Sequence, residues 1–298
     1  MLEVFILSSI LSCLCTYFLI PLLRKFCMDN PNQRSSHVKA TPRGGGLAFV
    51  LVGTLLNLLY APESIRWIPI ICLPLALIGL IDDMRGLTAF FRYSIQIITG
   101  IVLVINANLT ISNGISILFI LLITALINFV NFMDGLDGLV AGCGVLLLAS
   151  TSSWAIAGAI FGFLIWNWSP AKIFMGDVGS TFIGAIFGGL LIHTDSYYES
   201  LGILLIGFPL FADAFFCLVR RCMQRENIFQ AHRKHLFQRL HQAGWTHRDV
   251  ATLYISGVAI LFVSKLLTGL PGLLICVSIE FIYGLYLDNY VAKEFQRA

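Results

Sequence analysis

Long apolar segments are the feature of this sequence that most constrains its fold. Eleven of them follow one another through the 298 residues, at about 2–23, 44–62, 67–82, 93–109, 114–132, 138–153, 154–168, 179–194, 200–220, 249–267 and 271–289. Several are shorter than the roughly 20 residues that cross a bilayer as a helix, and an indistinct junction at 150–155 leaves ten spans as an alternative. Only 12% of the residues are charged, against roughly 25% in soluble domains. The sequence therefore predicts an all-α integral membrane protein with ten or eleven transmembrane helices.

The basic residues predict how these helices cross the membrane. If the N-terminus lies outside, 17 of the 19 Lys and Arg residues fall in inner connections, and only Arg66 and Lys265 fall outside. Inner loops of membrane proteins are enriched in such residues. We therefore expect the N-terminus outside, the C-terminus inside and a cytoplasmic His/Arg-rich loop at about 221–248.

Residues 1–298 are expected to form a single membrane domain, because no internal repeat or low-complexity tract divides them. The first 20 residues lack a basic n-region, which favours a retained first span over a cleaved signal peptide. The eight cysteines contain no CxxC and no zinc-type spacing. Neither a disulfide nor a metal–thiolate site is therefore expected.

Four polar residues interrupt the apolar pattern where the fifth segment ends: Asn128, Asn131, Asp134 and Asp137. In a continuous helix, at about 100° per residue, the nine steps from Asn128 to Asp137 turn the chain by about 180°, so the four residues would not share one face. Glycines follow both aspartates, so we expect the helix to stop near Asp134 and the chain to fold back. Helix caps and Asp-Gly turns explain any one of these residues but not all four. Such groups beside an apolar helix require cationic or hydrogen-bonding partners.

Three further aspartates lie at predicted helix ends. Asp82 and Asp83 end the third segment, and neighbouring helical residues diverge by about 100°, so the two are expected to have different roles. Arg92 and Gln96 follow one turn apart on the next segment and could reach a phosphate. Asp177 lies between glycines at a helix start, where it could bind Mg²⁺ while N–H groups approach phosphate oxygens. For Asp82 and Asp83 the alternative is a charged helix end at the membrane surface. For Arg92 and Gln96 it is interfacial anchoring, and for Asp177 it is a helix N-cap.

The inner loop carries a basic cluster of His232, Arg233, His235 and Arg239. His232, His235 and Arg239 have the spacing of one helical face. The two histidines lack a third ligand in the sequence, so zinc is weakly indicated, and anionic lipid is an alternative partner. Beside so many carboxylates, a phosphate-bearing substrate is the better interpretation. Within the spans, Asp213 is either functional or a buried partner of a basic residue, and Glu280 is assigned no role.

Carboxylates and carboxamides without thiolates favour Mg²⁺, with Mn²⁺ as an alternative. Two anions that must meet also need a cation between them. The expected chemistry is therefore phosphoryl transfer between a nucleotide-activated donor and a membrane phosphate.

The order of these motifs resembles that of the polyprenyl-phosphate N-acetylhexosamine-1-phosphate transferase family. The resemblance rests on Asp82-Asp83, the segment Asn128–Gly138, the Met-Gly-Asp177-Val-Gly-Ser motif and the basic histidine loop. It implies a multi-pass enzyme of the bacterial inner membrane that moves a sugar phosphate from a UDP-N-acetylhexosamine to undecaprenyl phosphate and releases UMP. A homodimer is left open, and no nucleic-acid partner is expected.

The resemblance also implies roles for individual residues. Asp82, Asp83 and Asp177 are the expected catalytic residues, and Asp177 and Asn131 are the expected metal ligands. The substrate-binding residues are expected to be Arg92, Asn128, Asn131, Asp134, Asp137, His232, Arg233, His235 and Arg239. Direct attack by the lipid phosphate is favoured over an aspartyl-phosphate intermediate.

The segment His232–Leu240 is similar to the branch that starts O-antigen on N-acetylated 6-deoxyhexoses (fucosamine or quinovosamine), with Phe237 a candidate contact for the sugar methyl. Peptidoglycan- or teichoic-acid-initiating transferases are the alternative within the family. A CDP-alcohol phosphotransferase would carry an Ala-Arg that is lacking after Asp134-Gly135. A transporter would show inverted repeats and mid-membrane broken helices, and an intramembrane aspartyl protease would need two facing aspartates within the membrane.

Overall fold

The computed structural model describes residues 1–31, 36, 39–107, 113–227, 230 and 232–297. Arg34, one of the basic residues assigned to inner connections, and residues 108–109 of the fourth apolar segment lie outside these ranges. The elements in chain order are α1 Leu2–Phe26, β1 Met28–Asp29, β2 Thr41–Pro42, α2 Leu47–Tyr60, α3 Glu63–Arg66, α4 Ile68–Arg85, α5 Ala89–Asn106, α6 Asn113–Met133, α7 Leu139–Ser150, α8 Trp154–Asn167, α9 Asp177–Ile192, α10 Tyr197–Ile206, α11 Phe208–Met223, α12 Leu236–Gln242 and α13 His247–Tyr286. A π-turn at Leu287–Val291 and a 3₁₀ turn at Phe295–Arg297 follow.

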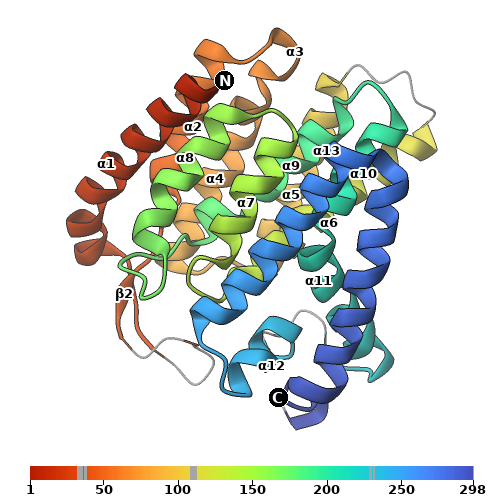
Figure 1. The fold of residues 1–298 in the computed structure, drawn as a ribbon. Helices are drawn as coiled ribbons and strands as arrows, with labels where there is room; N and C mark the ends of the chain where they lie inside the picture. The colour runs from red at the N-terminus through yellow and green to blue at the C-terminus, as the bar shows by residue number, and fades with distance from the viewer. Residues whose placement is uncertain (32–35, 37–38, 108–112, 228–229, 231, 298) are drawn as a thin grey trace.

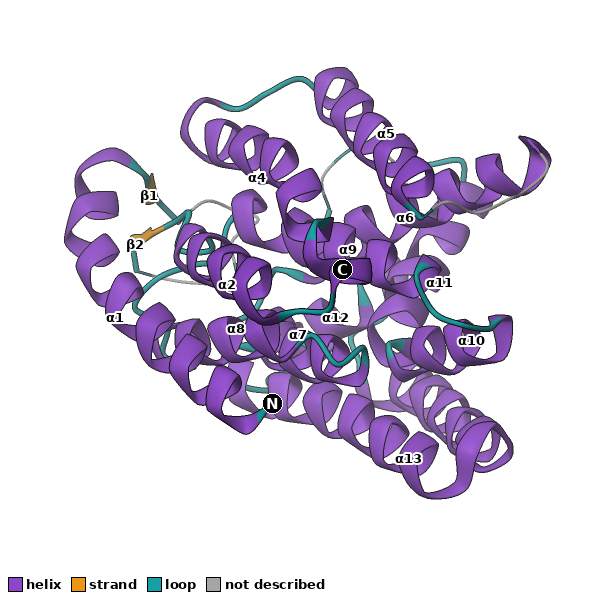
Figure 2. Ribbon diagram, turned by 90° about the horizontal axis from the view of Figure 1, so that it is seen from above, coloured by secondary structure: helices purple, strands orange, loops and turns teal. Residues whose placement is uncertain are grey.

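Helix α9 is the centre of the bundle (Figure 2). Every residue from Val178 to Ile192 is buried, and α4 and α6 pack along it. Small residues allow this close packing: a Cβ on Gly184 would lie 2.6 Å from the Cα of Ile127 on α6. A helix that is apolar on all sides is typical of a membrane protein core.

The outer helices expose large apolar side chains, such as Phe18 on α1 (70%) and Leu267 on α13 (78%). Within the described chain, five helices are long and apolar enough to cross a membrane, or six if the bent pair α10–α11 counts as one span. Four shorter apolar helices, α2, α7, α8 and α9, lie among them. The predicted all-α integral membrane class is confirmed. Figure 1 shows the two termini at opposite ends of the bundle.

Two of the apolar segments depart from straight helices. The segments at 249–267 and 271–289 together form α13, which breaks at Gly269 (φ 65°, ψ −158°) and turns back on itself (Figure 1), so that Gly257 faces Glu280. The segment at 200–220, expected as one helix, is divided into α10 and α11 with a bend of 78°. Pro209 in the first turn of α11 cannot continue the preceding helix, because its nitrogen has no hydrogen to donate.

The fold-back after the fifth apolar segment is confirmed. Helix α6 ends at Met133, a turn covers 134–138, and α7 begins at Leu139. Gly138 adopts φ +75° before α7, a conformation that costs little without a Cβ. Its position also leaves no room for one, since a Cβ would lie 2.7 Å from the Trp168 ring.

Asp213 holds helix α12 in place. Its carboxylate accepts hydrogen bonds from the N–H groups of Leu236 (2.7 Å) and Phe237 (3.0 Å) and from the Tyr254 hydroxyl (2.7 Å). The first two are N–H groups of the first turn of α12, which has no earlier turn to accept them. Asp213 therefore ties α11, α12 and α13 together and has a structural role.

Replacing Asp213 by Ala should leave these buried donors without an acceptor and lower the free energy of unfolding by about 3 kcal/mol. Thermal unfolding of the purified protein in detergent measures this. Asp195→Ala, at an exposed loop position, is the control and should unfold like the unchanged protein. Equal melting temperatures for the Asp213 and Asp195 variants would contradict the structural role.

Candidate functional site

Asp83 lies under the N-terminus of α9. Its Oδ1 accepts the Asp177 N–H at 2.9 Å and its Oδ2 accepts the Val178 N–H at 3.3 Å. Arg43 also contacts Asp83, with Nε 2.7 Å from Oδ1, and its Nη2 lies 2.6 Å from Asp177 Oδ1. The Asp83 side chain is fully buried, and a carboxylate at a helix N-terminus is stabilised by the helix dipole. Asp83 therefore positions Asp177.

Asp82 points to a different neighbour, as expected for adjacent residues on a helix. Its Oδ2 lies 3.0 Å from Nη1 of Arg92, and the same Nη1 lies 3.6 Å from Oδ2 of Asp177. The Leu87 N–H donates to the other oxygen of Asp82. One arginine nitrogen thus reaches the carboxylates of α4 and α9 together, so Asp82 and Asp83 have different partners, and their different roles remain a prediction.

Glycines make this close approach possible. A Cβ on Gly79 of α4 would lie 2.6 Å from the backbone of Asp177, and a Cβ on Gly176, whose φ is +75°, would clash with the Asp83 carboxylate. The segments before α2 and α9 are also paired by hydrogen bonds from Gly45 N–H to Phe174 O and from Gly46 N–H to Met175 O, both 2.9 Å. The Gly-Asp motif is therefore a packing requirement as well as a chemical one.

A pocket of about 260 Å³ opens beside this acidic pair. Its polar wall includes seven of the predicted site residues: Asp82, Arg92, Asn128, Asn131, Asp177, His232 and His235. Asn128 donates to Gln96 Oε1 at 2.7 Å. Asn131 donates to Ser180 Oγ at 3.0 Å, which leaves its carbonyl oxygen for another partner. The structure brings together residues that lie up to 153 positions apart in the sequence.

Asp134 and Asp137 do not line this pocket. Asp137 Oδ1 lies 3.2 Å from His247 Nδ1, and its Oδ2 accepts the Ala171 N–H at 3.1 Å. Burial alone would raise the pKa of Asp137, but His247 and the Ala171 N–H hold it below its usual range. Burial, together with the charges of Asp177 and Asp83, raises the pKa of Asp134 to about 7 despite Arg43. Asp137 thus joins the turn at 134–138 to α13, and Asp134 lies close enough to Asp83 and Asp177 for their charges to raise its pKa.

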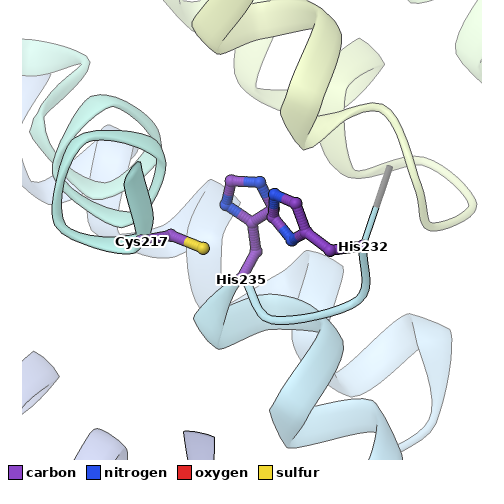
Figure 3. Close-up of side chains that lie close together, drawn as sticks. All are labelled: Cys217, His232 and His235. Atoms are coloured by element: carbon purple, nitrogen blue, oxygen red, sulfur yellow. The ribbon is translucent and has the colours of Figure 1, made fainter. Parts of the chain in front are cut away.

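His232 and His235 meet at the pocket in a stacked pair, with ring centroids 4.9 Å apart. Burial and the charge of nearby His235 and Arg221 lower the pKa of His232 to about 3. His232 is therefore uncharged at neutral pH and can offer a phosphate a hydrogen bond but no positive charge. Figure 3 shows both rings beside Cys217 of α11, an arrangement that the cysteine spacing did not predict.

Arg233 and Arg239, the two arginines of the predicted basic cluster, do not line this pocket. Arg239 is 2% exposed, donates to Lys293 O at 2.9 Å and contacts the Asp288 carboxylate near the C-terminus. The carbonyl of Arg233 accepts from the Gln242 side chain at 2.8 Å. Phe237, the candidate contact for a sugar methyl, is fully buried and packs against Gly135. The single helical face expected for His232, His235 and Arg239 does not form, because α12 begins only at Leu236.

Arg43 is the main site residue that the sequence did not single out. Burial by itself would lower its pKa, but the carboxylates of Asp83 and Asp177 raise it above its ordinary value. The signal in the sequence is its place directly before three glycines, Gly44–Gly46, which allow its backbone to approach the loop before α9. Its partner Asp177 is 134 residues away, and its partner Asp83 lies on α4, so both contacts follow from tertiary structure alone.

The donor set beside Arg92 suits a hard divalent cation. Oδ2 atoms of Asp82 and Asp177 face the same nitrogen, and Asn131 lines the same pocket. Carboxylate and amide oxygens are the ligands that Mg²⁺ and Mn²⁺ prefer. The residues present therefore fit the expected metal.

Comparisons with known proteins agree with this geometry. Residues 66–195 match the model of glycosyl transferase family 4, a range that includes the aspartates of α4 and α9. The chain is 27% identical to a probable undecaprenyl-phosphate N-acetylglucosaminyl 1-phosphate transferase of Bacillus subtilis, over 85% of this chain and 82% of that protein.

Two further relatives have similar names. The chain is 29% identical to the undecaprenyl-phosphate alpha-N-acetylglucosaminyl 1-phosphate transferase of Thermotoga maritima, over 75% of this chain and 79% of that protein. It is 28% identical to the decaprenyl-phosphate N-acetylglucosaminephosphotransferase of Mycobacterium tuberculosis, over 77% and 72%. With the acidic pocket at the ends of apolar helices, these matches identify residues 66–195 as a glycosyl transferase family 4 domain and show that the chain is similar, over most of its length, to polyprenyl-phosphate N-acetylglucosamine-1-phosphate transferases.

Proposed function

We propose that the protein transfers N-acetylhexosamine 1-phosphate from a UDP-linked donor to undecaprenyl phosphate and releases UMP. The observation that carries this proposal is the pair of arginines, Arg43 and Arg92, that link three aspartates beside a pocket in a membrane bundle. A site with both acidic and basic groups can hold two phosphate-bearing substrates close together, since each substrate anion gains a counter-charge. The apolar surface of the bundle allows a polyprenyl chain to remain in lipid.

In this reaction an oxygen of the lipid phosphate attacks the phosphorus that carries the sugar. The bond from that phosphorus to the bridging oxygen breaks, and the oxygen leaves with UMP. A phosphate monoester has a second pKa near 6 and is mostly dianionic at pH 7, so a general base adds little. Positioning and neutralisation of charge are then the main contributions of the protein.

The chain's own groups divide these tasks. Asp82, Asp177 and Asn131 would hold Mg²⁺, which would supply charge neutralisation for the diphosphate. Arg92 would bind phosphate oxygens, and Asn128 and the two histidines would orient the donor by hydrogen bonds. Direct attack is favoured over an aspartyl-phosphate intermediate, because both Asp83 oxygens already accept N–H groups and both Asp82 oxygens are engaged.

The membrane orientation, the product and the donor sugar are part of the same proposal. The basic residues favour an N-terminus outside and a pocket that faces the cytoplasm of a bacterial inner membrane. The product would start O-antigen or a related envelope glycan. The loop His232–Leu240 favours a 6-deoxy donor, whereas the names of the Bacillus, Thermotoga and Mycobacterium relatives favour UDP-N-acetylglucosamine. Burial of Phe237 removes one argument for the 6-deoxy sugar.

The decisive experiment measures UMP release by purified protein with undecaprenyl phosphate, Mg²⁺ and a panel of UDP-N-acetylhexosamines, including 6-deoxy donors. We expect UMP with at least one donor and none when the lipid is left out. The preferred donor distinguishes the two sugar assignments. If no donor yields UMP, the proposed reaction is refuted.

Asp177→Asn should reduce turnover by about 100-fold or more, because one charged oxygen of the metal and phosphate site is lost. UMP release across a range of Mg²⁺ concentrations measures this, and Asp195→Asn on the exposed loop is the matched control. Unchanged turnover with unchanged Mg²⁺ dependence would remove Asp177 from the site.

Asp82→Asn and Asp83→Asn should have different effects on turnover and thermal stability. Asp82 lines the pocket, so its variant should keep its melting temperature and lose turnover. Asp83 binds the N-terminus of α9 and Arg43 in a buried position, so its variant should lose thermal stability as well. Thermal unfolding and UMP release are measured on both; equal stability losses would show that the two roles are not separated in this way.

A further inference from the structure

Three soft metal-ligating side chains meet beside the pocket. Cys217 Sγ and one ring nitrogen each of His232 and His235 all lie within 4.8 Å of one another. Cys217 comes from α11 and the histidines from the segment that leads into α12, and Figure 3 shows the sulfur next to the two imidazoles. We propose that these three side chains form a binding site for one Zn²⁺ ion.

The donor set distinguishes this site from the acidic one. One thiolate and two imidazoles suit Zn²⁺, whereas Mg²⁺ prefers oxygen ligands. Zinc bonds of about 2.0–2.3 Å place ligand atoms roughly 3.3–3.8 Å apart in a tetrahedron. The three ligand atoms lie within 4.8 Å of one another, so side-chain shifts of about 1 Å would bring them to these distances. The fourth position would be taken by water or by an oxygen of a bound molecule.

The burial of Cys217 and His235 supports a specific binding site. Cys217 and His235 are 4% and 3% exposed, and among the described residues Nδ1 of His235 has no hydrogen-bond partner. The nearest carboxylate oxygen, Oδ1 of Asp213, lies 3.6 Å away. The negative charge of Asp213 would offset part of the charge of the ion.

One contact competes with the metal. The Lys234 N–H donates to Nδ1 of His232 at 3.2 Å. A metal must therefore displace this hydrogen bond or take Nε2 after a change of tautomer. Either change is small beside the binding free energy of zinc to thiolate and imidazole ligands.

The proposed zinc site shares two of its ligands with the main pocket. His232 and His235 line that pocket, whereas Cys217 does not. A bound ion would fix both imidazoles toward α11 and withdraw them from the donor, so Zn²⁺ should inhibit transfer. This consequence rests on the proposed transferase function, but the binding of the ion does not.

The binding test uses the full-length protein in detergent, purified without a polyhistidine tag, with Zn²⁺ titrated against a chromogenic chelator. One equivalent should bind, and Cys217→Ser should weaken binding at least tenfold while the melting temperature stays unchanged. Cys222→Ser, at an exposed cysteine of the same helix, is the matched control. With Co²⁺ in place of Zn²⁺, thiolate-to-cobalt absorption should appear for the unchanged protein and Cys222→Ser but not for Cys217→Ser. Absence of binding, or equal binding by all three proteins, would overturn the site.

The activity test adds Zn²⁺ to the UMP-release assay at constant Mg²⁺. Inhibition of the unchanged protein and of Cys222→Ser, but not of Cys217→Ser, is expected. Equal inhibition of all three would assign the effect to the carboxylates and overturn the link to Cys217. Zinc binding by a protein that releases no UMP with any donor would support the metal site and refute the transferase proposal.

Discussion

The contact between the Asp83 carboxylate and the N-terminus of α9 is the interaction on which the site depends. Helix α9 is buried along its whole length after Asp177, so its first N–H groups cannot turn to water and need an acceptor from the protein. Asp83 supplies it from α4. A buried carboxylate in turn needs a counter-charge, and Arg43 supplies that from the loop before α2. Three separate parts of the chain are thereby fixed at one point.

This arrangement places Asp177 where its carboxylate faces both arginines. Arg43 reaches one oxygen and Arg92 approaches the other. Each arginine also pairs with a second aspartate, so two positive charges face the three carboxylates of Asp82, Asp83 and Asp177. A pocket of this composition can exchange internal ion pairs for contacts with a metal and phosphates, because the groups are already oriented.

The histidine loop is held by a second buried carboxylate. Asp213 accepts the first N–H groups of α12, much as Asp83 does for α9. On its far side, α12 is fixed by Arg239, which contacts Asp288 and the Lys293 carbonyl. Arg239 also lies over the Phe295 ring, 5.5 Å from its centroid. The C-terminal residues thus contribute to the position of His232 and His235 without touching the pocket.

The fold class, most helix ends and seven residues of the pocket follow from local patterns in the sequence, whereas the division of segment 200–220 into α10 and α11 does not. Apolar length predicts helices, and Gly-Asp and Asp-Gly pairs mark their ends, because these signals are local. The helix break at Gly269 and the turn after Met133 follow from the same local rules. Asn128, Asn131, Asp82 and Asp177, which line the pocket, are singled out by the sequence because polar groups at the ends of apolar helices are costly without a partner.

Which groups face one another depends on the packing of the helices. Arg43 pairs with Asp83 and Asp177, Asp137 pairs with His247, and Cys217 lies beside the two histidines. These contacts join residues that are far apart in sequence, where no periodic pattern relates them. Arg239 and Phe237 looked like ligand contacts in the sequence but are buried in packing. Charge and apolarity specify what a side chain can do, whereas the packing of helices around α9 specifies which surface it reaches.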